Sequence, residues 1–290
     1  MKKNKIQLFD VIIHIITAFL LIIVMYPMLL VISNSLSDPG MVATGKVLFL
    51  PKGFSFDGYI EFFKDKNILT GYGNTFYYAI LGTLIDLVVT VPAGYALSKN
   101  TLPGNKIFLM AFMFIMYFSG GMIPTFLVVS KLGLYNSRWT LLLLGAFSTY
   151  NCIICKSFFD SIPKDLEDAA QIDGCSPMRT FIQVVLPISK ALLGVMVLYF
   201  GVAHWNSYFN ALIYIKDDAK QPLQIFLRRL LILAEQAETG VTGEFDEAMI
   251  FQEALLRYSS IVISSLPLMV VYPFLQRYFD KGVLIGAVKQ

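Results

Sequence analysis

The stretch VIIHIITAFLLIIVMYPMLLVIS, residues 11–33, indicates the class of this fold. It contains no Asp, Glu, Lys or Arg and can cross a hydrocarbon core of roughly 30 Å at about 1.5 Å per helical residue. Lys2, Lys3 and Lys5 precede it, as basic residues do in a secretory signal peptide. The run is longer than the roughly 7–15 apolar residues of such a peptide and lacks a small-residue cleavage site, so we expect a retained first transmembrane helix.

Further apolar stretches of similar length follow along the chain, at residues 74–97, 106–130, 139–159, 188–215 and 259–279. The whole sequence is 56% hydrophobic and only 15% charged, against about 25% charged in ordinary soluble domains. In lipid the backbone must satisfy its own hydrogen bonds, and the period-two alternation of a membrane barrel is absent. We therefore predict an all-α membrane protein with six transmembrane helices embedded in a lipid bilayer.

This pattern divides the chain into a first helix with its external segment (1–73), a core membrane domain (74–280) and a C-terminal tail (281–290). An even number of spans places both termini on one side. The Lys-rich N-terminus assigns that side to the cytoplasm by the positive-inside rule, although the excess of basic residues is small. We expect a multi-pass protein of the cell membrane whose N- and C-termini are both cytoplasmic.

Cysteines and histidines do not form a recognisable site. Cys152 and Cys155 make a C-x-x-C pair inside an apolar stretch, and Cys175 alone cannot complete a zinc site, so helix packing is the expected role of the pair. His14 and His204 are far apart in the sequence. We predict no catalytic residues and no metal site.

Nucleotide and nucleic-acid binding are also not expected. Residues 40–47, GMVATGKV, nearly match a phosphate-binding loop, but Val47 replaces the hydroxyl residue that contacts magnesium, and no strand precedes the loop. The net charge of +3 is mild, without a block of basic residues, so nucleic acid is an unlikely partner class.

The longest polar segment on the predicted inner side is DSIPKDLEDAAQIDGCSPMRTFIQVVLP, residues 160–187. Ser161 can cap a helix that has Pro163 just inside its start, and Gly174 can end that helix in a left-handed conformation. The pair at 176–177, Ser followed by Pro, repeats the start signal for a second helix that ends at the final proline. The segment thus predicts a helix, a turn and a second helix.

The spacing of this segment resembles the cytoplasmic signature of the type I permease subunits of ATP-binding-cassette importers. That signature is Glu-Ala-Ala, three residues, Gly, nine residues, Ile, one residue and Leu-Pro. The matching residues here are Asp168, Ala169, Ala170, Gly174, Val184, Leu186 and Pro187. Asp for Glu and Val for Ile are the two departures, and Glu167 could supply the longer carboxylate.

This resemblance implies a type I importer transmembrane fold in which the loop is a coupling helix that docks on a separate ATPase. The implied coupling residues are Glu167, Asp168, Ala169, Ala170, Gly174, Leu186 and Pro187. The chain would be a transport subunit and not an enzyme, with no cofactor of its own. Two ATPase subunits would bind ATP and magnesium, and a second homologous permease and an extracellular sugar-binding protein would complete the complex.

Other stretches resemble the carbohydrate-type permeases of this family, which implies import of a carbohydrate such as an oligosaccharide. They are Gly120 to Pro124, Trp205-Asn206, Lys281-Gly282 and Gly286 to Lys289.

Candidates for a substrate pathway lie in the fifth and second apolar stretches. Trp205, Asn206, Tyr208 and Asn210 combine rings that stack on sugars with amides that bond hydroxyls, but an aromatic belt at the membrane interface explains them equally well. Asp86 is an ionisable residue inside a span, which is a functional candidate by default. It can instead pair with another helix or face a water-filled cavity. An ion-coupled secondary carrier that uses Asp86 is the alternative function.

Overall fold

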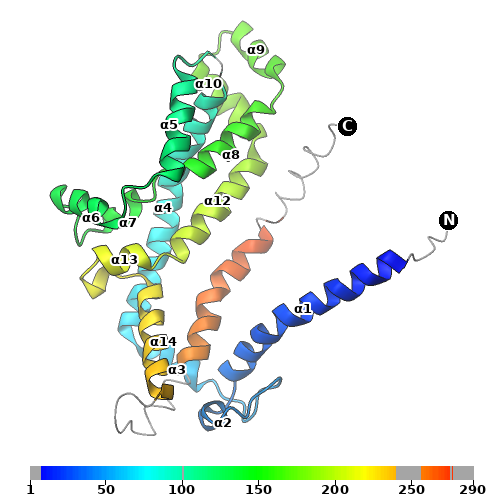
Figure 1. Ribbon diagram of the computed structural model, residues 1–290, viewed down its shortest axis with the longest axis vertical. Helices are drawn as coiled ribbons and strands as arrows, with labels where there is room; N and C mark the ends of the chain where they lie inside the picture. The colour runs from blue at the N-terminus through cyan, green and yellow to red at the C-terminus, as the bar shows by residue number, and fades with distance from the viewer. Residues whose placement is uncertain (1–7, 100, 240–255, 275, 277–290) are drawn as a thin grey trace. The chain divides into compact units, whose positions relative to one another are not determined.

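The computed structural model describes residues 8–99, 101–239, 256–274 and 276. These residues are mainly helical and contain no strand (Figure 1). The labelled elements are α1 (Leu8–Ser35), α2 (Pro39–Ala43), α3 (Asp57–Lys64), α4 (Lys66–Ser98), α5 (Asn105–Tyr117), α6 (Met122–Lys131), α7 (Arg138–Leu143), α8 (Thr149–Asp160), α9 (Lys164–Ile172), α10 (Pro177–Thr180), the π-helical turn η1 (Phe181–Val185), α11 (Leu186–Ile188), α12 (Lys190–Trp205), α13 (Phe209–Tyr214), the 3-10 turn η2 (Asp218–Lys220) and α14 (Leu223–Thr239). A further helix covers residues 256–274.

Two helices within the described part of the chain are long and apolar enough to cross a membrane unbroken, over Phe9–Ser35 and Lys66–Ser98. Two bent pairs raise this number to as many as four. They are α5 with α6, bent by 111°, and residues 177–188 with α12, bent by 84°. The all-helical membrane fold is confirmed, whereas the predicted count of six transmembrane helices is not.

Three predicted spans are interrupted by local backbone chemistry. The stretch 106–130 breaks before α6 at Gly121, whose φ of 87° is readily adopted only by glycine. The stretch 139–159 breaks between α7 and α8, where the Ser148 hydroxyl accepts a hydrogen bond from the Asn151 N–H and starts a new helix. The stretch 188–215 breaks after Trp205, and α13 follows as a short separate helix.

The chain divides into two compact units, and the candidate functional site lies in the second. The first unit comprises residues 1–68 and 226–266, and the second comprises residues 69–225 and 267–290. The domain boundary expected at residue 73 stays a prediction, and the tail at 281–290 lies outside the described residues.

The second unit has a hydrophobic core in which α4, α8, η1 and α12 meet. Val91, Phe159, Phe181 and Met196 represent these four elements, and all are at most 6% exposed. Gly94 permits the close approach of α4 to α8, since a Cβ atom there would lie 2.4 Å from the Cys155 Cβ. Figure 1 shows α9 at one end of this unit, beyond the ends of these core helices.

Candidate functional site

The helix α9 begins at Lys164, directly after Pro163. Asp165 and Glu167 lie in its first turn, where the helix dipole stabilises negative charge. The expectation that Ser161 caps this helix is wrong. Ser161 has right-handed helical dihedrals at the end of α8, and its hydroxyl donates to the Phe158 carbonyl at 2.6 Å, so it ends one helix instead of starting the next.

The turn after α9 has the predicted chemistry. Gly174 has a φ of 76°, and its N–H donates to the Gln171 carbonyl at 3.0 Å. Ser176 caps the following helix, with its hydroxyl accepting from the Arg179 N–H at 3.4 Å and Pro177 at the first helical position. Helical backbone continues through η1 and α11, one residue past the predicted end. The helix, turn and helix of this segment are confirmed.

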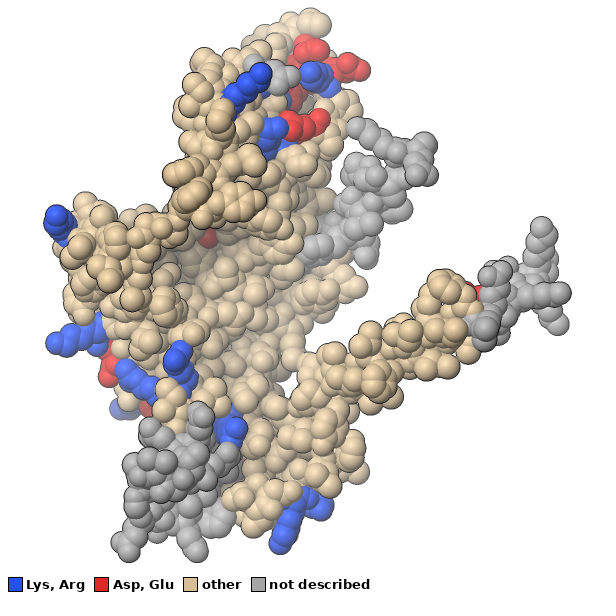
Figure 2. Space-filling model, in the orientation of Figure 1, with Lys and Arg blue, Asp and Glu red and all other residues tan. Residues whose placement is uncertain are grey.

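The implied coupling residues divide between two faces of this segment. The exposed residues are Asp168, Ala169, Gly174 and Pro187. The residues turned toward the protein are Glu167, Ala170 and Leu186. Apolar side chains also project outward, since Leu166 and Ile172 are 44% and 87% exposed. The outer face of α9 therefore combines carboxylates, a small alanine and apolar side chains, and Figure 2 shows charged side chains gathered over this end of the unit.

Glu167 differs from the other carboxylates of α9 because Lys99, the residue that follows α4, already binds it. The Lys99 ammonium donates to both of its oxygens, at 2.5 Å for Oε2. The Glu167 side chain is only 13% exposed as a result. It is therefore not presented on the outer surface as a contact for another chain.

Asp86 is paired with a histidine of another helix. Its Oδ2 lies 2.8 Å from the Nε2 of His204 on α12, and both side chains are buried. Gly82 makes room for the imidazole, since a Cβ there would lie 2.5 Å from two of its ring atoms. Of the roles left open for Asp86, pairing between helices is the one that the structure shows.

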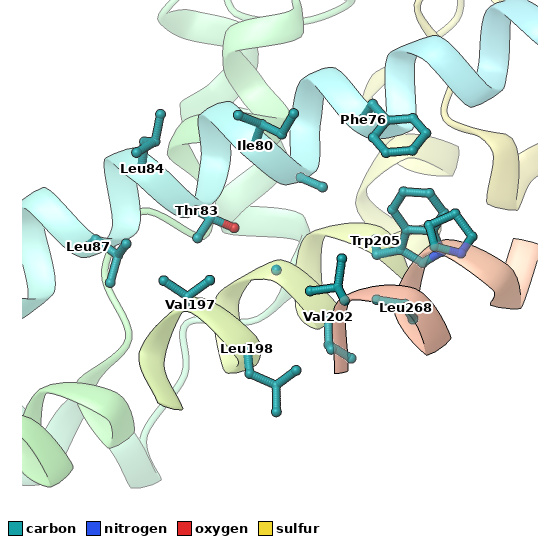
Figure 3. A pocket seen from close by; sticks show the side chains of 14 residues that line it. Phe76, Ile80, Thr83, Leu84, Leu87, Val197, Leu198, Val202, Trp205 and Leu268 are labelled. Carbon is teal, nitrogen blue, oxygen red and sulfur yellow. The ribbon is translucent and has the colours of Figure 1, made fainter. Parts of the chain in front are cut away.

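An apolar cavity of about 420 Å³ lies between α4, α12 and residues 267–271 (Figure 3). Trp205 is part of its wall and is 3% exposed, with its ring edge-on to Phe76 at a centroid distance of 5.1 Å. Thr83 belongs to the lining, but its Oγ1 is buried, and the surface that faces the cavity is almost wholly apolar. A sugar needs several polar partners, so this cavity suits an apolar group better.

The predicted pathway residues are not gathered around this cavity. Trp205 lines it, whereas Asp86 does not. Asn206 and Tyr208 are exposed beyond the end of α12, and Asn210 is half-buried in α13. Contact of any of these residues with substrate stays a prediction.

Cys152 and Cys155 are fully buried free thiols of α8, which confirms the packing role predicted for them.

A second polar cluster, around residues 216–222, was not predicted from the sequence. Asn136 has a φ of 57°, and its Oδ1 accepts from the N–H groups of Lys216 and Asp217 at 3.0 Å each. Asn74 of α4 donates from Nδ2 to two carbonyls of the same segment, at 2.9 Å each. The N–H of Ala219 lowers the pKa of Asp217, to which it donates at 3.0 Å. The two asparagines hold this segment in place, and single asparagines carry no periodic signal that would have revealed it.

Comparison with known proteins relates most of the chain to one family. Residues 68–285 match the family of binding-protein-dependent transport system inner membrane components. The chain is 39% identical over 267 residues to the protein LplC of Bacillus subtilis (strain 168), covering 92% of this chain and 90% of that protein. It is 36% identical over 287 residues to the polygalacturonan/rhamnogalacturonan transport system permease protein YtcP of the same organism, covering 99% of each chain.

A solved structure is similar along almost its whole length. It is the crystal structure of a bacterial ABC transporter involved in the import of the acidic polysaccharide alginate. One of its chains matches this one with a TM-score of 0.84 and 30% sequence identity, covering 96% of this chain and 99% of that chain.

Proposed function

Because this chain belongs to the family of binding-protein-dependent transport system inner membrane components, we propose that it is the permease subunit of an ATP-driven importer for an oligosaccharide or polysaccharide fragment. The relatives support this class of cargo, since one is named for polygalacturonan and rhamnogalacturonan and another for alginate. YtcP is named a transport system permease protein, which supports a transport subunit.

The proposal that ATP drives this importer rests on the outward face of α9. Asp168 and Ala169, which match the family signature, are exposed there beside the apolar Leu166 and Ile172. Apolar side chains in water are unfavourable unless another surface covers them. An ATPase subunit that binds ATP and magnesium is the partner proposed for this face, and α9 is then the coupling helix.

The proposed complex contains a second homologous permease, two ATPase subunits and an extracellular sugar-binding protein. Its membrane is the cell membrane, with α9 and both termini of this chain on the cytoplasmic side. ATP binding would close the two ATPase subunits, and their movement would reach the membrane helices through α9.

The alternative of an ion-coupled carrier finds no support. The family of the chain is one of binding-protein-dependent systems, and the Asp86 carboxylate is bonded to His204.

Uptake into proteoliposomes tests the proposal. The assembled transporter is reconstituted with ATP inside, the binding protein outside and a panel of labelled acidic and neutral oligosaccharides. We expect uptake of at least one oligosaccharide that requires ATP and persists when ionophores collapse all ion gradients. Uptake that follows an ion gradient without ATP, or no uptake of any oligosaccharide, would contradict the proposal.

A further inference from the structure

Lys99 directly follows the last residue of α4 and reaches across to α9. Its ammonium donates to both carboxylate oxygens of Glu167, and the two side chains are only 27% and 13% exposed. Charge-assisted hydrogen bonds to two oxygens are stronger than neutral ones, and partial burial reduces their screening by water and salt. This contact therefore differs from the weak ion pairs of an exposed surface.

The ring of Tyr95, one turn earlier in α4, contacts the Lys99 ammonium. The Lys99 Nζ lies 4.2 Å from the centre of the Tyr95 ring, within the range of a cation–π interaction. The same ring packs against Phe181 of η1 at 4.7 Å and against Phe159 of α8 at 5.5 Å. The cation is thus held between the carboxylate of α9 and an aromatic group that belongs to the core.

The pair is the polar link between α9 and the long helix α4. Within the described part of the chain, no other ion pair joins α9 to another element. Backbone packing connects α9 chiefly to α10 and η1, which follow it in the sequence. A force applied to the outer face of α9 can therefore reach α4 through Glu167 and Lys99.

The helix α4 extends this connection to the cavity. It is unbroken over Lys66–Ser98, so a shift at its Lys99 end is carried along its axis. Farther along, Leu87, Thr83 and Ile80 line the cavity, and Asp86 is bonded to α12. Movement of α4 would displace the cavity wall and strain its connection to α12.

We propose that Lys99 is a positioning residue of the transport cycle, which ties α9 to α4 through Glu167 so that movement of α9 displaces the membrane helices. This role rests on the proposed function, because it requires a partner that moves α9. Loss of the link would leave ATP hydrolysis on the partner intact while less of it is converted into transport.

The test measures substrate imported per ATP hydrolysed by the assembled transporter in proteoliposomes. Lys99→Met and Glu167→Gln each remove one charge of the link with little change in volume. Allosteric coupling typically changes an equilibrium by about 5- to 150-fold, so we expect each variant to lower the ratio at least about fivefold. Lys99→Arg keeps a cation that can contact both Glu167 and the Tyr95 ring, so this variant should import as much substrate per ATP as the unaltered protein.

A matched control is available in α8. Lys156 and Asp160 form an ion pair of 2.6 Å within that single helix, so Lys156→Met removes a comparable charge without cutting a link between helices. We expect the ratio to stay unchanged in this variant.

The result that would overturn the role of Lys99 differs from the result that would contradict the proposed function. Ratios unchanged from those of the unaltered transporter in both Lys99→Met and Glu167→Gln would overturn the role of Lys99. If either variant fails to assemble, the double variant Lys99→Glu with Glu167→Lys, which exchanges the two charges, tests the role of Lys99 instead. Recovery of assembly and of most of the ratio supports the link, and assembly without that recovery overturns it. Absence of ATP-dependent uptake in the unaltered transporter contradicts the proposed function instead.

Discussion

Replacing Gly82 by alanine should destabilise the packing of α4 against α12. The added Cβ would lie 2.5 Å from Cε1 and Nε2 of His204 and 2.7 Å from Nδ1. Carbon atoms in contact are ordinarily about 3.5–4.0 Å apart, so the imidazole would have to move by about 1 Å. His204 is buried and bonded to Asp86 at 2.8 Å, and such a shift directed away from Asp86 would stretch that bond to roughly 3.8 Å, beyond hydrogen-bonding distance.

Two effects contribute to the expected cost. Overpacking of a well-packed site costs about 1–3 kcal/mol. Loss of a hydrogen bond by a buried polar group costs about 1–3 kcal/mol more. Asp86 would bear this cost in full, because its Oδ1 already has no partner among the described residues. We therefore expect Gly82→Ala to lower the free energy of unfolding by roughly 2–6 kcal/mol.

Unfolding of the purified permease in mixed micelles, followed by its tryptophan fluorescence, measures this cost. Gly145→Ala is the matched control, since its Cβ would lie 4.0 Å from the same imidazole, an ordinary contact distance. In a His204→Ala background the clash is gone, so Gly82→Ala should cost less than about 0.5 kcal/mol there. A cost equal in both backgrounds, or no larger than that of Gly145→Ala, would refute the reasoning.

Three further predictions concern the polar cluster around residues 216–222 and the thiols. Asn136→Ala should destabilise the protein by about 1 kcal/mol more than Asn136→Gly in thermal unfolding, because both lose the amide but only alanine is strained at a φ of 57°; equal midpoints would contradict this. Asn74→Ala should cost about 1–3 kcal/mol in the same assay, since two buried carbonyls lose their donor; an unchanged midpoint would argue against that anchoring role. Maleimide should label Cys175, which is partly exposed, well before the fully buried Cys152 and Cys155, and comparable rates would be inconsistent with their burial.

Local features of the structure were largely predictable from the sequence. Apolar runs indicated membrane helices, and the stop at Gly174 and the cap at Ser176 follow from chemistry within a few residues. The breaks inside the apolar runs were missed because hydropathy averaged over a span hides a single residue such as Gly121. Ser161 was misassigned because its hydroxyl can serve the helix before it as readily as the helix after it.

The side-chain contacts that could not be predicted join residues far apart in the sequence. Lys99 and Glu167 are 68 residues apart, and Asp86 and His204 are 118 apart. Each residue alone has an ordinary local explanation, and only the folded chain shows its partner. The family signature singled out the loop around α9, but it did not reveal that Glu167 faces inward while Asp168 faces outward.

If ATP drives this permease through the loop around α9, substitution of two comparable glycines should affect uptake very differently. Gly174 and Gly133 both have positive φ, 76° and 69°, and neither has an atom within 4 Å of an added Cβ, so phenylalanine strains both backbones alike. Gly133 lies in the loop between α6 and α7, well separated from α9 (Figure 1). ATP-driven uptake by the assembled transporter should fall at least about tenfold in Gly174→Phe and stay within about twofold in Gly133→Phe. Equal uptake by the two variants would contradict the claim.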